Sequence, residues 1–163
     1  MKIIFLDIDG VLNYIGCKYK SPTGCLGIDP EKVCLLKQIV DATAAKIVLT
    51  STWKTDWFRT SHIEDLPKDG QYMCKQLLQY GLRILDKTED TEWSKRGEGI
   101  LNWLNNYSNT VGSFVIIDDE SFDFEEQNLI NNFVHTDFAD GIQISHVQKA
   151  IEILLNRKEK SLK

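Results

Sequence analysis

Short apolar runs rich in β-branched residues recur along the chain and alternate with stretches of helical periodicity. Runs at residues 2–6, 46–49, 113–117 and 132–135 are typical of strands buried on both faces of a sheet, and residues 83–85 predict a short edge strand. Strands that alternate with helices favour a mostly parallel sheet, because parallel neighbours need long right-handed crossovers. The pattern therefore predicts the α/β class, with three layers and a mostly parallel central sheet.

The segments between these runs carry the start and stop signals of helices. Residues 29–31, Asp-Pro-Glu, combine an N-cap acid, a proline at the first helical position and a glutamate near the positive end of the helix dipole. Further helices are predicted around residues 70–80, with a glycine at the C-terminal end, and over 96–107. A last helix is expected to begin at Ser145, with Gln148 completing a capping box.

Two polar segments show no clean periodicity. Residues 8–28 predict a long polar loop, and residues 51–69 are polar and aromatic without a recognisable element. A loop as long as the first one inside a compact domain usually has a function. Both segments follow predicted strands, where ligands bind in parallel sheets.

The length of 163 residues fits one domain, which we expect to cover residues 1–157, with a basic tail at 158–163. The net charge of −5 argues against non-specific coating of nucleic acid, which needs a basic face. The apolar runs are far shorter than the roughly 20 residues of a membrane-spanning helix, and the N-terminus does not resemble a signal peptide. Four cysteines without a C-x-x-C pair favour reduced thiols and a cytoplasmic protein, with a metal or disulfide role left open for Cys17 and Cys25.

Three of the predicted strands end in polar residues that carry chemistry. The first ends at Asp7, with Asp9 two residues further on; the second ends at residues 50–51, Thr-Ser; the third ends at residues 118–119, Asp-Asp. In a parallel sheet these strand ends meet at one edge. Clustered carboxylates repel one another unless a cation joins them, and oxygen ligands suit a hard ion such as Mg²⁺.

These residues carry a resemblance to a known group of enzymes. Residues 7–12, DIDGVL, resemble the first motif of the haloacid dehalogenase (HAD) superfamily. Thr50 resembles the second motif, Lys95 or Arg96 at the start of a helix the third, and residues 118–119 the fourth, in the right order along the chain. The longer segments DIDGVLN, KIVLTSTW, KRGEGILNWL and FVIIDDES are similar to the HAD domains associated with Swiss Army Knife RNA repair proteins.

The resemblance implies a Rossmann-like, HAD-like fold and a phosphatase that works through an aspartyl-phosphate with Mg²⁺. Asp7 would be the nucleophile, and Asp9 would protonate the leaving group and then activate water. Thr50 would bind the phosphate together with either Lys95 or Arg96; the sequence leaves that choice open, with Lys87 as a third candidate. Gly10, Ser51 and Thr52 are expected to contact the substrate. The expected metal ligands are Asp7, Asp118, Asp119 and Asp9, the last through its backbone carbonyl.

The sequence leaves two interpretations open for each of two smaller features. Asp123 extends the fourth motif as D-x-x-x-D or caps a short helix of its own. The aromatic residues after the second predicted strand either stack against a nucleobase or pack over the sheet edge; they are Trp53, Trp57 and Phe58.

The gaps between motifs bear on the substrate. In this superfamily a cap domain often follows the first motif or lies between the second and third, but residues 13–28 and 54–94 leave room for a minimal cap only. An open site admits bulky phosphates, so we expect a phosphorylated substrate such as a nucleotide or an RNA or DNA end, without a membrane or an obligate protein partner.

Three rival functions remain at this point. A phosphotransferase on the same fold would need an acceptor alcohol, and a non-catalytic module would keep the metal and phosphate site for binding only. A response-regulator receiver domain also clusters aspartates with a threonine and a lysine, but its order along the chain differs.

Overall fold

The central sheet has five strands, all parallel, in the order β3-β2-β1-β4-β5. A computed structural model of the chain describes residues 1–155. The predicted α/β fold with a Rossmann-like layout is confirmed, and the sheet is parallel throughout. The strands are β1 (Lys2–Leu6), β2 (Lys46–Leu49), β3 (Ile84–Lys87), β4 (Ser113–Asp118) and β5 (Phe133–His135).

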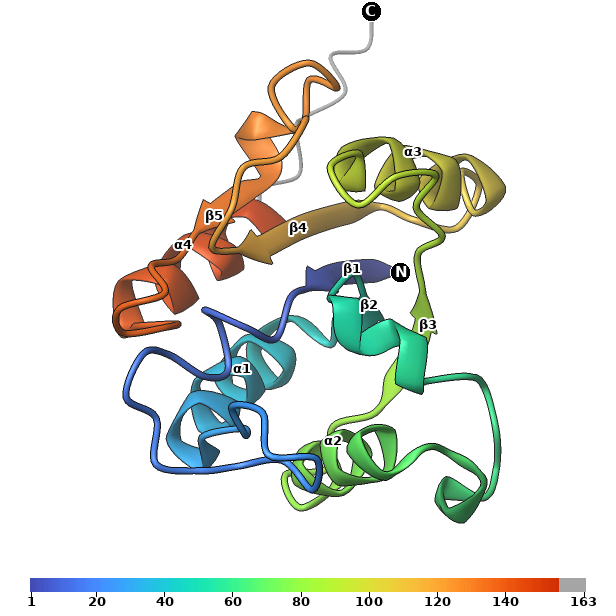
Figure 1. Cartoon of the computed structure of the whole chain (residues 1–163). Coiled ribbons are helices and arrows are strands. Elements are labelled where there is room, and N and C mark those ends of the chain that lie inside the picture. Colours follow the sequence, from blue (N-terminus) through green and yellow to red (C-terminus); the bar gives the residue numbers. More distant parts are fainter. Residues whose placement is uncertain (156–163) are drawn as a thin grey trace, which may run out of the picture.

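Helices cover both faces of this sheet (Figure 1). Buried side chains of α1, α2 and α4 share one core cluster with one face of the sheet, whereas those of α3 share a second cluster with the other face. The helix bounds are α1 (Pro30–Thr43), α2 (Lys68–Leu78), α3 (Arg96–Asn106) and α4 (Ile144–Leu155). The structure thus has the three layers that the alternation of strands and helices predicts.

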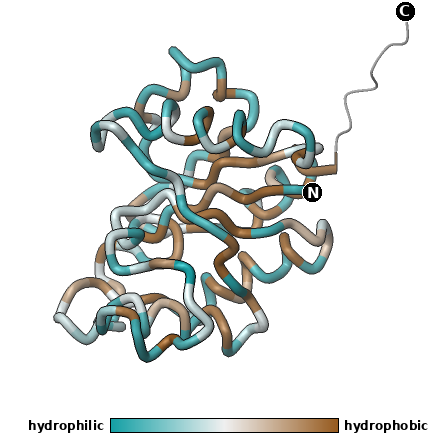
Figure 2. The backbone as a smooth tube through the Cα atoms, turned by 90° about the vertical axis from the view of Figure 1, so that its right-hand side faces the viewer, coloured by the Kyte–Doolittle hydropathy of each residue, from teal (hydrophilic) through white to brown (hydrophobic). Residues whose placement is uncertain are grey.

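The two-sided burial explains why the strands are continuous apolar runs. In β1, Ile4 and Leu6 face α1 and α4, while Ile3 and Phe5 face α3. The ring of Phe5 meets the ring of Trp103 on α3 edge to face at 5.5 Å. Figure 2 shows the strands as hydrophobic segments in the interior of the fold.

The edge strand and the segment before it differ from the prediction. β3 runs two residues further than the apolar pattern indicated, because Asp86 and Lys87 still pair with β2. The Asp86 carboxylate is satisfied there by hydrogen bonds from Trp103 (2.9 Å) and Tyr107 (3.2 Å). Residues 51–69 hold two short 3₁₀ helices, η1 (Thr52–Asp56) and η2 (Ile63–Asp65), and α2 already begins at Lys68. Lys87 of β3 donates to the carbonyls of Lys54 (3.1 Å) and Trp57 (3.0 Å), and no local pattern encodes these contacts.

The predicted helix ends hold for α1 and α2. The Asp29 carboxylate accepts from the backbone N–H of Glu31 at 2.9 Å. At the end of α2, Gly81 has a φ of +73°, and the N–H of Leu82 donates to the carbonyl of Leu77 at 3.1 Å, as in a Schellman motif.

The predicted capping box of the last helix is wrong. α4 begins at Ile144, and the N–H of Gln143 donates to Nδ1 of His146 at 3.0 Å. The imidazole thus supplies the reciprocal acceptor that a glutamate or glutamine supplies in a capping box.

The predicted basic tail at 158–163 lies outside the described residues, as does the end of the predicted domain at 157. Between residues 1 and 155, none of the helices is both long and apolar enough to cross a membrane. The four cysteines have free thiols.

Candidate active site

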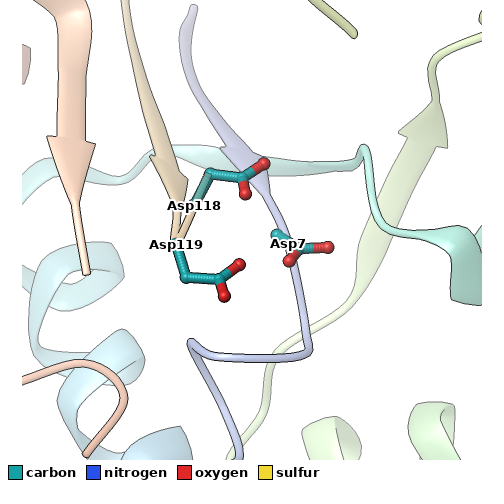
Figure 3. A group of neighbouring side chains, drawn as sticks. All are labelled: Asp7, Asp118 and Asp119. Atoms are coloured by element: carbon teal, nitrogen blue, oxygen red, sulfur yellow. The ribbon is translucent and has the colours of Figure 1, made fainter. Parts of the chain in front are cut away.

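Three carboxylates meet at the carboxyl edge of the sheet. Asp7 directly follows β1, Asp118 is the last residue of β4, and Asp119 follows it. One carboxylate oxygen from each lies within 4.8 Å of the others, and Figure 3 shows the three side chains close together where β1 and β4 end. The sequence prediction that these acids converge is therefore correct in geometry.

Burial makes this cluster electrostatically costly. It raises the pKa of Asp7 from 3.8 to about 6, although Arg96 and a hydrogen bond from Ser51 act in the opposite direction. Burial and the neighbouring Asp7 carboxylate also raise the pKa of Asp118 well above its usual range. The pKa of the half-buried Asp119 is raised as well, mainly by burial. One guanidinium does not offset three carboxylates, so the site calls for a further positive charge.

The donor set fits a hard divalent cation. All three side chains offer carboxylate oxygens, and no sulfur or imidazole belongs to the group that the described residues form. Mg²⁺ prefers such oxygens and keeps positions free for water and for a substrate phosphate. Asp7, Asp118 and Asp119 are the residues that could hold it.

Arg96, the first residue of α3, lies among these acids. Its Nη1 is 3.3 Å from Oδ1 of Asp7 and also donates to Asp118, and the ring of Phe122 lies 4.2 Å from the guanidinium carbon. The side chain of Lys95 is exposed and lies 3.9 Å from Glu98 instead. Lys87 donates to the carbonyls of Lys54 and Trp57. Of the basic residues that the sequence left open, the structure thus brings only Arg96 to the carboxylates.

The start of α3, and with it Arg96, is held by a residue far along the chain. Lys95 provides no side-chain cap, but the Asp123 carboxylate accepts from the N–H groups of Gly97 (2.6 Å) and Glu98 (3.0 Å). A Cβ at Gly97 would lie 2.8 Å from the Asp123 carboxylate, so the contact needs glycine. Asp123 therefore neither joins the acidic group nor caps a helix of its own; it caps α3.

Two buried donors at the site have no hydrogen-bond partner among the residues that the structure describes. Thr50 Oγ1 and Arg96 Nε are both buried without a hydrogen bond. Such atoms are rare in folded proteins because an unsatisfied buried donor costs about 1–3 kcal/mol. The oxygens of a bound phosphate would satisfy both. Ser51 is also buried, whereas Thr52 is exposed at the start of η1.

Asp9 and Gly10 lie in the turn after Asp7. The Asp9 carboxylate is not one of the three grouped acids; it accepts from Nε1 of Trp53 at 3.0 Å and from the Asn13 amide at 2.7 Å. Its backbone carbonyl as a metal ligand stays a prediction. Gly10 has a φ of +73°, and a Cβ there would lie 2.4 Å from the Asp119 side chain. Glycine at this position lets Asp119 approach the turn.

Of the two interpretations of the aromatic residues that follow the second strand, packing is confirmed for Trp53 and Trp57. Trp53 and Trp57 are only 8% and 7% exposed because they pack in the core beside α2. Phe58 is exposed but lines a cavity with Trp57 and Ile63, apart from the acids.

Sequence reasoning missed two residues around the site, Phe122 and Asn13, and one contact of Trp53. Phe122 covers Arg96 from a left-handed backbone conformation, with a φ of +40°, which no pattern announces. The contacts of Trp53 and Asn13 with Asp9 were also missed. Their only signal is that both belong to the polar segments after the first and second strands.

The parallel sheet, the aspartates after its strands and the arginine at the start of α3 define a HAD domain. The family described as "HAD domain in Swiss Army Knife RNA repair proteins" matches residues 3–147, so the chain belongs to this family and to the HAD superfamily. No curated protein matches the chain. Membership indicates an activity of the phosphatase type, and HAD domains usually use a metal.

Proposed function

We propose that the chain is a Mg²⁺-dependent phosphomonoester hydrolase that acts through an aspartyl-phosphate on Asp7. The observation that carries the proposal is the pairing of a three-carboxylate group with two unpartnered buried donors, Thr50 Oγ1 and Arg96 Nε. The carboxylates suit a cation, and the donors suit the phosphate that this cation would share.

Asp7 is the proposed nucleophile. Its carboxylate oxygen attacks phosphorus, and the bond from phosphorus to the leaving oxygen breaks. Arg96 and Thr50 donate to the phosphoryl oxygens, where negative charge repels the attacking carboxylate. When bound, Mg²⁺ supplies the further positive charge that offsets this repulsion.

Asp9 is the proposed acid and base. It gives a proton to the leaving alkoxide, then takes a proton from the water that attacks the phosphoryl group on Asp7. That second step releases inorganic phosphate and restores both carboxyl groups to their starting states.

For the substrate we propose a nucleotide or the phosphorylated end of a nucleic acid. An open cavity of about 600 Å³ adjoins the acidic group at Asp119 and offers room for a bulky leaving group; its lining also includes Glu120, His135 and Asp137. The family description names RNA repair proteins, which agrees with this class of substrate.

Phosphate release tests the proposal. An aryl phosphate, nucleoside monophosphates and oligonucleotides with 5′- or 3′-phosphates are incubated with Mg²⁺, with chelator, and with the variant Asp7→Asn. The proposal expects metal-dependent release that the variant lacks. Release only after addition of an acceptor alcohol would show a phosphotransferase instead, and binding without any turnover would show a non-catalytic module.

A further inference from the structure

Both oxygens of the Asp9 carboxylate are engaged by residues outside the acidic group. Trp53 Nε1 donates to Oδ2 at 3.0 Å, and the Asn13 side chain donates to Oδ1 at 2.7 Å. Asp9 itself lies in a turn after β1 and is only half-buried, so neither a strand nor a packed core fixes its side chain. The two donors are what sets the direction of this carboxylate.

The indole that holds Asp9 is itself fixed. Trp53 is in η1, whose N-cap Ser51 accepts from the backbone N–H of Trp53 at 3.4 Å. Its ring packs in the core beside Tyr72, with ring centroids 6.5 Å apart, and Tyr72 in turn accepts from the N–H of Ile28 at 3.0 Å. An indole packed in this way cannot turn its N–H to follow a moving carboxylate. An indole N–H is also a donor only, so its partner must present an acceptor.

The Asn13 amide is oriented as firmly as the indole. Its Oδ1 accepts from the backbone N–H of Gly10 at 3.0 Å, and the side chain is fully buried. A backbone N–H can only donate, so the amide nitrogen must face Asp9. Donors from two separate segments of the chain thus converge on one carboxylate.

We propose that Trp53 and Asn13 are positioning residues for Asp9 that hold its carboxylate where it can protonate the leaving oxygen. The inference rests on the proposed function, because the direction of the Asp9 carboxylate affects the reaction only if Asp9 is the acid. A shift of about 1 Å in such a group can cost on the order of 100-fold in rate.

The dependence on the leaving group distinguishes positioning from plain stability. An alkyl alkoxide is a poor leaving group and needs the proton, whereas a nitrophenolate leaves without it. The ratio kcat/KM reports the first half-reaction, in which this group departs. Loss of the indole donor therefore lowers kcat/KM for the alkyl substrate far more than for the aryl one. A general loss of folding or metal would lower both values equally.

The test compares Trp53→Phe with Trp103→Phe on an alkyl phosphate and on p-nitrophenyl phosphate, both with Mg²⁺. Trp103 is a matched control: it is 6% exposed, and its Nε1 donates to Asp86 at 2.9 Å on the opposite face of the sheet. For Trp53→Phe we expect kcat/KM to fall roughly 10- to 100-fold with the alkyl substrate and less than about 3-fold with the aryl one. Trp103→Phe should leave the ratio between the two substrates unchanged.

A second variant and a spectrum guard against misfolding of Trp53→Phe. Asn13→Ala should shift the ratio of the two substrates in the same direction. The indole N–H signal of Trp53 in the ¹H–¹⁵N spectrum is identified by sequence-specific assignment or by its absence in Trp53→Phe. This signal should shift in Asp9→Asn relative to the wild type.

Equal losses on both substrates in Trp53→Phe and Asn13→Ala, or an indole signal that ignores Asp9→Asn, would overturn the positioning role and leave the proposed function standing. A wild type that hydrolyses neither substrate would overturn the proposed function and this inference together.

Discussion

Nη1 of Arg96 lies 3.3 Å from Oδ1 of Asp7, so the start of α3 is joined to the end of β1 across the candidate site. Both side chains are almost fully buried, and Arg96 also donates to Asp118. Loss of Arg96 would leave two buried carboxylates without the cation that offsets them, and such an uncompensated buried charge is costly. The exposed neighbour Lys95 pairs with Glu98 instead, so variants of the two residues distinguish their roles.

Arg96→Met should abolish most phosphate hydrolysis, while Lys95→Met should not. We expect kcat/KM to fall at least about 100-fold for Arg96→Met, the size of loss seen when a donor to a developing anion is removed. Steady-state kinetics with saturating Mg²⁺ measure this. Lys95 is the control, because its side chain lies 3.9 Å from Glu98 and makes no contact with the acids. Equal losses in both variants would contradict the assignment of Arg96.

Gly10→Ala should weaken metal binding. A Cβ at Gly10 would lie 2.4 Å from the Asp119 side chain and push it out of the acidic group. We expect the apparent affinity for Mg²⁺, from titrated activity or a thermal shift, to fall about 10-fold, equivalent to roughly 1.4 kcal/mol. Gly81→Ala is the matched control: Gly81 has the same φ of +73° but no heavy atom within 4 Å of the added methyl. It should lose similar backbone stability and keep its Mg²⁺ affinity; equal metal affinities in the two variants would speak against the steric argument.

Asp123→Ala should impair both stability and activity, because it removes the cap that holds the start of α3. Loss of an N-cap costs about 0.5–2 kcal/mol in the free energy of unfolding, measured by chemical denaturation. Asp29→Ala removes a similar cap from α1, where the carboxylate accepts from Glu31 at 2.9 Å. We expect comparable destabilisation in both variants, but a loss of kcat/KM beyond about 5-fold only in Asp123→Ala, whose cap adjoins Arg96. Equal losses of kcat/KM in Asp123→Ala and Asp29→Ala would show that the cap of α3 does not position Arg96 for the reaction.

Asp7→Asn should stabilise the metal-free protein at neutral pH. The pKa of Asp7 is about 6 in the folded protein against 3.8 for an unperturbed carboxyl, so the folded state binds more protons than the unfolded chain between these values. Its contribution to stability is therefore most favourable below pH 3.8 and is lost as the pH rises through about 6.

Thermal unfolding of the wild type and Asp7→Asn in chelator, from pH 4 to pH 8, isolates this effect. The melting temperature of the variant should exceed that of the wild type at pH 7, and the difference should shrink toward pH 4. Added Mg²⁺ should raise the wild-type value at pH 7, since a ligand that binds only the folded state stabilises it. A variant less stable than the wild type at pH 7 would contradict the cost of the buried acids.

The local pattern of the chain was sufficient for most of the fold. The runs that became β1, β2 and β4 are buried on both faces, and this is why they could be recognised without alternation. The pattern was insufficient at β3, where Asp86 is held by side chains of α3, and at α4, where His146 took the part assigned to Gln148. Both differences arise from hydrogen bonds that the periodicity of apolar residues does not encode.

The sequence likewise predicted one part of the candidate site and missed another. That Asp7, Asp118 and Asp119 converge follows from topology alone, because they end parallel strands. The choice between Lys95 and Arg96 depended on how the first turn of α3 is oriented. The distant Asp123 caps this turn, and no local pattern reveals that contact. The contact of Trp53 with Asp9 joins residues 44 positions apart and could not be predicted from the sequence.

The phosphorylation of Asp7 is the central claim, and mass spectrometry of acid-quenched protein tests it most directly. The protein is mixed with Mg²⁺ and an excess of substrate that it hydrolyses, stopped in acid within one turnover, and digested. We expect a phosphoryl group on the peptide that carries Asp7, and no such adduct or phosphate release in Asp7→Asn. A phosphoryl group on another residue, or hydrolysis that persists in Asp7→Asn, would contradict the proposed mechanism.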